Sequence, residues 1–141
     1  MDPVNLLQAI YQNYREKRLA DVLALLSEEF KLTVSLPDDL PSEQLRARSK
    51  AETALLVHSF LDQYDVLVFE PGEIEVAGEM VTARPTVEFR HKKSGRILQT
   101  QFTHTWHIAD GRATRLHQNH DADKLRAYSK ACSADGHKQS V

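Results

Sequence analysis

Cysteine is nearly absent from this chain of 141 residues: Cys132 is its only one, so no internal disulfide and no paired-cysteine motif can form. Such a composition suits a reducing cytoplasm. No stretch approaches the ~18 apolar residues of a membrane span, and the N-terminal residues lack the apolar core of a signal peptide. Basic charge is not in excess either, because the formal net charge is -2. We therefore expect a soluble, unprocessed, cytoplasmic protein that binds neither membranes nor nucleic acid.

Helical patterns dominate the first half of the chain and return at its end. Asp2 and Pro3 supply a cap and a first-turn proline for an amphipathic helix. The apolar face of this helix consists of residues that recur at helical spacing, which are Val4, Leu7, Tyr11 and Tyr14. Ser49 and Glu52 form a capping box in front of a helix over about residues 49–64. Shorter helices are expected at about 19–26 and 121–130.

Strand patterns occupy most of the remainder. Apolar and polar residues alternate over residues 30–36, and turn residues separate later segments, which predicts consecutive antiparallel strands. Pro85 cannot donate a ladder hydrogen bond, so its strand should carry a bulge or lie at an edge. The later strands are expected at residues 66–69, 74–76, 81–89, 97–108 and 113–118.

This order of elements predicts an α+β fold in which N-terminal helices pack in the concave face of a strongly curved, mostly antiparallel sheet. The result is a cone-shaped α+β barrel with an open end, which is a natural small-molecule pocket. We expect one domain over residues 1–131 and a disordered polar tail over 132–141.

A tight turn at Asp110 and Gly111 predicts how the two strands with four of the seven histidines pair. A two-residue type I′ turn needs positive φ at both positions and sets Ala109 opposite Arg112. A three-residue loop would instead reverse the faces of the second strand. With the shorter turn and a regular ladder, the expected pairs are Ile108 with Ala113, Trp106 with Arg115, His104 with His117, and Phe102 with Asn119.

All of these paired side chains would share the concave face. The residues between them would form an outward face, which consists of Thr103, Thr105, His107, Thr114, Leu116, Gln118 and His120. The four histidines then divide equally between the two faces, which argues against a metal site, because an HxxH pair points to opposite faces of a strand. We expect no metal and no other cofactor.

The opposed pair His104 and His117 has two interpretations. Imidazole titrates near neutrality, so the pair would suit acid–base chemistry. Alternatively, two neutral histidines satisfy a semi-polar core while Arg115 stacks on Trp106. Asp121, between a strand and a helix, is most simply a helix cap.

The hairpin also resembles a known family. Its pattern F-x-H-x-W, D-G, R and D resembles the SnoaL-like branch of the nuclear transport factor two-like (ketosteroid isomerase-like) superfamily, as does the opening segment YREKRLADVLALLSEEFKL. The resemblance implies the same curved sheet and conical pocket, and the family includes isomerases, dehydratases, epoxide hydrolases and polyketide cyclases. The matching residues are Phe102, His104, Trp106, Asp110, Gly111, Arg115 and Asp121.

Two details of the resemblance bear on chemistry. The closing aspartate can be the base in cyclases of this kind, which would give that role to Asp121. Steroid isomerases that resemble this fold carry a carboxylate base on the first strand, whereas KLTVSL has none, so steroid-type isomerisation is disfavoured.

We therefore consider two candidate functions for the protein. One is an acid–base isomerase, dehydratase or cyclase acting on a small apolar organic substrate. The other is a non-catalytic ligand-binding or dimerisation module, and in either case the uncharged outward face predicts a homodimer through the convex side of the sheet. The candidate catalytic residues are His104, His117 and Asp121, and the candidate substrate-binding residues are Tyr14, Phe102, Trp106, Arg115 and Asn119.

Overall fold

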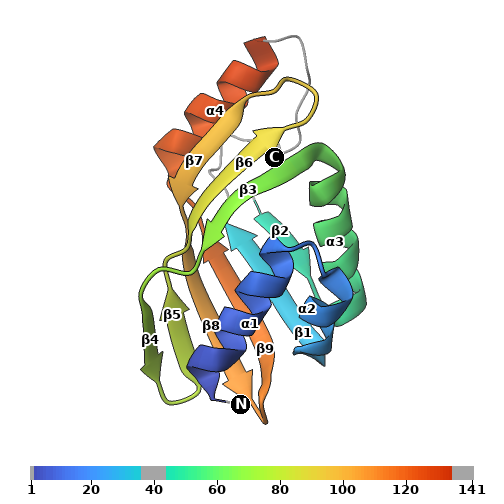
Figure 1. Ribbon diagram of the computed structural model, residues 1–141, viewed down its shortest axis with the longest axis vertical. Coiled ribbons are helices and arrows are strands. Elements are labelled where there is room, and N and C mark those ends of the chain that lie inside the picture. The colour runs from blue at the N-terminus through green and yellow to red at the C-terminus, as the bar shows by residue number, and fades with distance from the viewer. Residues whose placement is uncertain (1, 36–43, 135–141) are drawn as a thin grey trace.

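A curved sheet wraps around the N-terminal helix in the computed structural model, which describes residues 2–35 and 44–134 (Figure 1). The predicted α+β class is confirmed, with N-terminal helices and mostly antiparallel strands in a sheet that is curled but not closed. In chain order the elements are α1 (Pro3–Arg15), α2 (Leu19–Ala24), β1 (Leu26–Ser35), β2 (Gln44–Ala47), α3 (Lys50–Gln63), β3 (Tyr64–Glu70), β4 (Ile74–Ala77), β5 (Met80–Ala83), β6 (Thr86–His91), β7 (Ile97–Gln101), β8 (Thr103–Ala109), β9 (Arg112–Asn119) and α4 (Ala122–Ala134).

Side-chain caps fix the starts of α1 and α3 where the sequence predicts them. The Asp2 carboxylate accepts the Asn5 backbone N–H at 2.8 Å, and Pro3 is the first residue of α1. The Ser49 hydroxyl accepts the Glu52 backbone N–H at 3.1 Å in front of α3. Each bond satisfies a backbone donor that the helix itself cannot pair.

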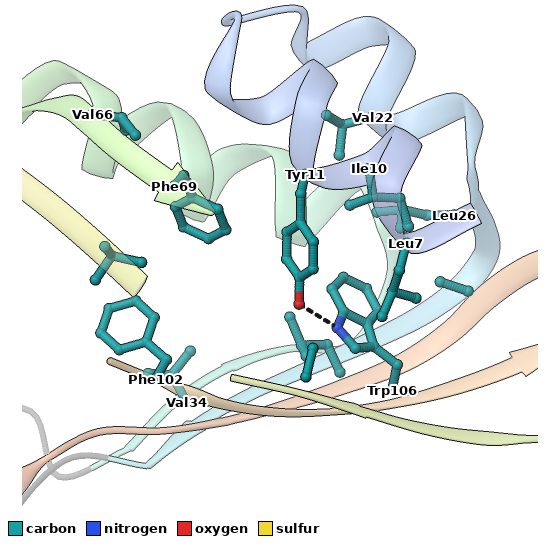
Figure 2. Close-up of a cluster of buried hydrophobic side chains, with 14 of the residues drawn as sticks. Leu7, Ile10, Tyr11, Val22, Leu26, Val34, Val66, Phe69, Phe102 and Trp106 are labelled. Carbon is teal, nitrogen blue, oxygen red and sulfur yellow. Dashed lines mark hydrogen bonds between the residues drawn. The ribbon is translucent and has the colours of Figure 1, made fainter. Parts of the chain in front are cut away.

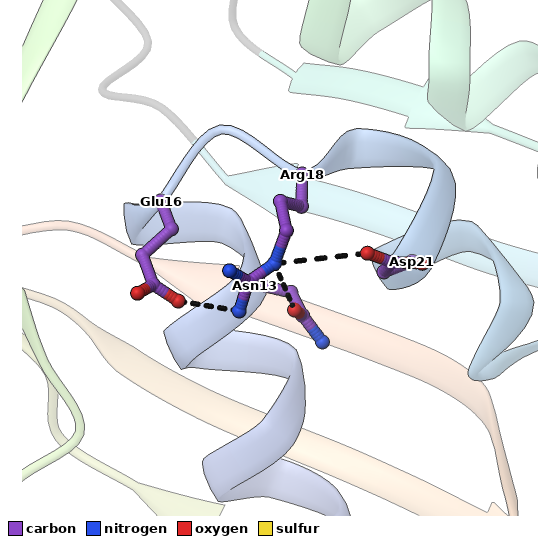
Figure 3. Close-up of polar contacts among 4 residues, drawn as sticks. All are labelled: Asn13, Glu16, Arg18 and Asp21. Carbon is purple, nitrogen blue, oxygen red and sulfur yellow. Dashed lines mark hydrogen bonds and ion pairs between the residues drawn. The ribbon is translucent and has the colours of Figure 1, made fainter.

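Arg18 ties α2 to the end of α1 (Figure 3). Its Nε donates to Asn13 Oδ1 at 2.9 Å and lies 3.6 Å from the Asp21 carboxylate, and its Nη2 pairs with Glu16. The preceding Lys17 has a φ of 62°, which lets the chain reverse direction between the helices. The turn thereby holds α2 beside α1.

The strands form two hydrogen-bonded groups. One has the order β2-β1-β9-β8-β5-β4 and the other the order β3-β6-β7. All neighbours are antiparallel except β1 and β9, which are parallel. A mostly antiparallel sheet was predicted, but the pairing of β1 with β9, which are far apart in the sequence, was not foreseen.

Two long strands expected from the sequence are each divided by a bend. The segment 81–89 becomes β5 and β6 on either side of Pro85, and the segment 97–108 becomes β7 and β8 on either side of Phe102. The Phe102 N–H donates to the Pro85 carbonyl at 3.0 Å, so the two bends face each other. Because proline has no N–H to continue a ladder, it suits the position at which the sheet changes direction.

The hairpin of β8 and β9 has the predicted turn but a different register. Asp110 and Gly111 have φ values of 54° and 74°, as a type I′ turn requires, and Ile108 pairs with Ala113. Beyond that pair, the ladder contains a β-bulge at Thr114 and continues with the pairs His107–Arg115, Trp106–Leu116, Thr105–His117, His104–Gln118 and Thr103–Asn119.

The expected pairs Trp106–Arg115, His104–His117 and Phe102–Asn119 are therefore wrong. A one-residue shift moves every later side chain of β9 to the other face. Leu116 becomes buried and Arg115 becomes exposed, which is the arrangement that apolar and charged side chains favour.

Helix α4 runs to Ala134, beyond the end expected near Lys130. Its N-terminal cap is Asp121, which accepts the Lys124 backbone N–H at 3.1 Å. Residues 135–141, which make up most of the expected tail, lie outside the described residues. The division into one domain and a tail stays a prediction.

Candidate functional site

A cavity of about 210 Å³ lies between helices α1 and α3 and the concave side of the sheet. Its wall consists mainly of aromatic and aliphatic side chains, part of which Figure 2 shows. No Asp, Glu, Lys or Arg is among the described residues that line it. An ion would lose its hydration there without a counter-charge, so the wall suits a neutral and largely apolar molecule.

The local structure explains how polar groups reach this wall. Burial alternates along β8, so His104 and Trp106 both point inward. Tyr11 and Tyr14 lie three residues apart on α1 and therefore share the helix face that covers the cavity. Because of the bulge, β9 contributes Leu116 and Gln118, and the residue order then brings His120 inward as well.

Five of these side chains form a hydrogen-bonded chain. It begins at the single tryptophan, and Figure 2 shows its first bond, from the Trp106 indole to the Tyr11 hydroxyl. The successive distances are 2.9 Å from Trp106 Nε1 to Tyr11 Oη, 2.7 Å from Tyr11 Oη to His104 Nδ1, 2.7 Å from His104 Nε2 to Gln118 Oε1, and 3.0 Å from Gln118 Nε2 to His120 Nε2.

The indole sets the direction of donation along this chain. Trp106 Nε1–H is only a donor, so the Tyr11 oxygen accepts from it, and the Tyr11 O–H donates to His104 Nδ1. A neutral His104 then carries its proton on Nε2 and donates it to Gln118 Oε1. The amide N–H of Gln118 donates to His120 Nε2, which leaves the His120 proton on Nδ1.

Burial keeps this chain uncharged near neutral pH. Desolvation lowers the pKa of His104 from 6.5 to about 4, and the hydrogen bond to Gln118 opposes this shift only in part. Burial likewise lowers the pKa of His120 to about 4. The pKa values of the Tyr11 and Tyr14 hydroxyls are raised for the same reason, so both stay protonated. At pH 7 the cavity wall therefore offers dipoles and no ionic charge.

Four of the eight residues proposed from the sequence line the cavity. They are Tyr14, Phe102, His104 and Trp106. Whether any of them acts on a substrate stays a prediction. His104, however, is 2% exposed, and both of its ring nitrogens are engaged in hydrogen bonds.

The other four lie elsewhere, which corrects their expected placement. His117 lies beyond the bulge on the outward side and bonds to the Ser35 hydroxyl at 3.1 Å. Arg115 and Asn119 are exposed, so Arg115 does not stack on the buried Trp106. Asp121 is exposed and caps α4, as its position between a strand and a helix suggested.

Sequence reasoning missed Tyr11, Gln118 and His120. Tyr11 stood on the expected apolar face of the first helix, and nothing local showed that its hydroxyl would meet a histidine 93 residues away. Gln118 and His120 were assigned to the outward face because the bulge was not foreseen. Leu116, an aliphatic residue among polar neighbours on that face, was the available signal of the true register.

The fold and the cavity together define a class: α+β proteins whose curled sheet and covering helices enclose a small apolar pocket. The family model described as "SnoaL-like domain" matches residues 7–116, and the chain belongs to this family. No curated protein sequence matches the chain.

Solved structures with this fold cover nearly the whole chain. A nuclear transport factor two-like protein of unknown function from Burkholderia pseudomallei is 19% identical, with a TM-score of 0.75 over 89% of this chain and 95% of that one. A provisionally named isomerase from Bacillus subtilis is 15% identical, with a TM-score of 0.76 over 90% and 91% of the two chains. A provisionally named polyketide cyclase from Xanthomonas campestris is 18% identical, with a TM-score of 0.70 over 89% and 94%. At these identities the likeness shows the fold alone.

Two features are absent from the described residues, a membrane-spanning helix and a metal-binding cluster. None of the helices in residues 2–35 and 44–134 combines the length and the apolar character that crossing a membrane takes. Within the same ranges, no three His, Cys, Asp or Glu side chains gather closely enough to hold a metal ion.

Proposed function

We propose that this protein binds one small, neutral, mostly apolar organic molecule in the cavity. The observation that carries the proposal is the wall itself, which is apolar and, among the described residues, free of ionic side chains. Pockets of this kind, with a few polar groups that orient a ligand, are the usual form of small-molecule sites. The membership of the SnoaL-like family is consistent with a pocket protein.

The volume of the cavity limits the size of the ligand. A cavity of roughly 150 Å³ accommodates benzene, and this one has about 210 Å³. A single aromatic ring with a short substituent therefore fits, whereas a polycyclic compound would require the wall to open.

Trp106 gives a direct assay for binding. It is the only tryptophan of the chain and lines the cavity, so its fluorescence reports on an occupant. We expect α-methylstyrene to change the emission saturably and to raise the Tm, whereas benzoate, which has the same ring and a negative charge, does neither.

A matched pair of substitutions on α3 locates the site. Val57 lines the cavity, whereas Leu55, two residues away, is 70% exposed. Val57→Phe should fill part of the cavity and weaken binding at least several-fold, and Leu55→Phe should leave it unchanged. Equal affinity in both variants would place the ligand elsewhere, and no binding by the wild type would end the proposal.

A second candidate is an enzyme that moves a proton within its substrate, as an isomerase, dehydratase or cyclase does. The chain of hydrogen bonds through two imidazoles in the wall supports it, and neighbours in fold are provisionally named as an isomerase and a polyketide cyclase. Of the three catalytic residues predicted from the sequence, His104 is retained because it lines the cavity. Its low pKa makes it a weak base, so binding is the better supported function.

Hydrogen exchange at carbon separates the two candidates without a known substrate. The methyl protons of acetophenone exchange with D₂O when a base removes one of them, and NMR follows the loss of signal. The enzyme candidate predicts exchange catalysed by the wild type and abolished in His104→Gln, with binding retained, because glutamine can hydrogen-bond but cannot titrate. Binding without catalysed exchange favours the pocket protein.

We also propose a cytoplasmic homodimer formed through the convex side of the sheet. Its row of outward side chains is Thr103, Thr105, His107, Arg115, His117 and Asn119, which replaces the row expected before the bulge was known. The absence of carboxylates from this row supports burial against a second copy. Light scattering should give a mass twice the 16.0 kDa of one chain. Thr105→Arg should lower this mass to that of one chain, whereas the control Thr86→Arg on β6 should leave the dimer intact. A monomeric wild type would contradict the dimer.

A further inference from the structure

His120 lines the cavity, and its buried Nδ1 lacks a hydrogen-bond partner among the described residues. Among the described residues, two buried side-chain atoms make no hydrogen bond, and they are Thr100 Oγ1 and His120 Nδ1. Thr100 is not part of the cavity wall, whereas His120 is. A buried unpaired donor is unfavourable, because it has lost its water without gaining another partner. A ligand that pairs with it recovers free energy that the protein alone cannot.

The protonation of this atom follows from the hydrogen-bonded chain. If the Gln118 amide were reversed, His120 would donate through Nε2, and its Nδ1 would become an acceptor. His104 would then have to donate to Tyr11, and the Tyr11 O–H would lose its partner, so two buried groups would stay unpaired instead of one. The arrangement with fewer unpaired groups has an N–H at His120 Nδ1.

The Tyr14 hydroxyl is a second polar group of the wall, and it is less suited than His120 to recognise a ligand. Tyr14 makes no hydrogen bond in the described part of the chain, but its hydroxyl is not among the buried unpaired atoms. The hydroxyl is therefore not a buried donor left unpaired, and a ligand that bonds to it recovers less free energy. Among the described residues of the wall, His120 Nδ1 alone is a buried atom without a hydrogen-bond partner.

We propose that the cavity selects small neutral carbonyl compounds, and that His120 Nδ1–H donates the hydrogen bond that recognises their oxygen. This inference rests on the proposed binding function and names its ligand class. Side chains cover the nitrogen in this structure, so binding includes a small turn of the His120 ring, whose centroid lies 4.5 Å from that of Phe102. Carboxylates are excluded, because a neutral imidazole cannot balance their charge.

Two ligands of nearly equal shape test this recognition. Acetophenone and α-methylstyrene differ by the exchange of C=O for C=CH₂, and their dissociation constants are measured through Trp106 fluorescence. The ratio of these constants is compared between the wild type and His120→Phe, so differences in the hydration of the free ligands cancel. We expect the preference for acetophenone to fall about fivefold in the variant, the worth of one neutral hydrogen bond.

The control is His107→Phe, the same exchange at a half-buried position on the outward side of β8. It should leave the ratio unchanged. If His120→Phe also leaves it unchanged while both ligands bind, recognition by His120 is wrong and the binding function stands. If neither ligand binds the wild type, the binding function itself fails.

Imidazole NMR of the wild type supplies a readout that needs no folded variant. Acetophenone should shift the His120 Nδ1–H resonance downfield, and α-methylstyrene should not. An equal response to both ligands, or to neither while both bind, would overturn the inference.

Discussion

Removing the Tyr11 hydroxyl breaks the hydrogen-bonded chain at its second member and should destabilise the fold. The Tyr11→Phe variant keeps the ring in place but leaves the Trp106 N–H without an acceptor and His104 Nδ1 without a donor. Both side chains are at most 3% exposed, so water cannot replace the lost oxygen. Each unpaired group costs about 1–3 kcal/mol, and we expect a loss of about 2–4 kcal/mol in the free energy of unfolding. For a domain of this size, the Tm should fall by roughly 10 °C.

Tyr14→Phe is the matched control. Tyr14 lies one turn further along α1, lines the same cavity and packs on the same Phe69, with ring centroids 5.0 Å apart against 5.4 Å for Tyr11. Its hydroxyl makes no hydrogen bond to the described residues, so its loss should cost less than about 0.5 kcal/mol. Urea unfolding followed by circular dichroism measures both variants. Equal losses in the two variants would refute the chain as a stabilising element.

Two further predictions concern the buried imidazoles and the bulge. Because the folded pKa of His104 is about 4 and the ordinary value is 6.5, the unfolded state binds more protons between these pH values. The neutral His104 therefore contributes about 3 kcal/mol to the free energy of unfolding above pH 6.5, and this contribution is lost as the pH falls towards 4. In urea unfolding, the free energy of unfolding of His104→Gln should depend less steeply on pH than that of the wild type. An equal pH dependence in both proteins would contradict the lowered pKa of His104. Leu116→Arg should cost several kcal/mol, because it buries a charge, whereas Arg115→Ala should change the free energy of unfolding by less than about 0.5 kcal/mol. The reverse ranking in chemical denaturation would favour the regular register over the bulge.

Local signals predicted the helices and the hairpin turn well, because short-range physics determines both. The caps at Asp2 and Ser49 satisfy helix donors within three residues, and the turn at Asp110 and Gly111 depends on two φ angles. Such features are complete within a short window of sequence. Their positions therefore needed no knowledge of the rest of the fold.

Pairing between distant segments was not predictable in the same way. The parallel neighbours β1 and β9 are separated by most of the chain, and no residue in either strand specifies the other. Proline at residue 85 marked its strand as exceptional, but the matching bend at Phe102 has no signal of its own. Its position becomes necessary only once β6 and β7 are known to pair.

The candidate site shows the same limit. The resemblance of the hairpin to SnoaL-like proteins led us to expect a conical pocket, and His104 and Trp106 line the cavity of the structure. The Tyr11 hydroxyl that joins these two side chains comes from α1, and sequence periodicity placed Tyr11 only on an apolar helix face. Periodicity predicts which face is buried but not which polar group a buried hydroxyl meets.

The bulge at Thr114 determines whether His117 or His120 reaches the cavity. The free energies of the regular and the bulged register can be compared from the sequence alone. A regular ladder would bury Arg115 without a counter-charge and expose Leu116, and exposure of a leucine alone forfeits about 1.5–3 kcal/mol. The bulge sacrifices about one ladder hydrogen bond, with a net worth of about 1 kcal/mol. The bulged register is therefore the more stable one, and through the same shift it moves His117 out of the wall and brings His120 in. A hairpin whose regular register sets a charge inward and an aliphatic residue outward should be examined for a bulge before a site is assigned to it.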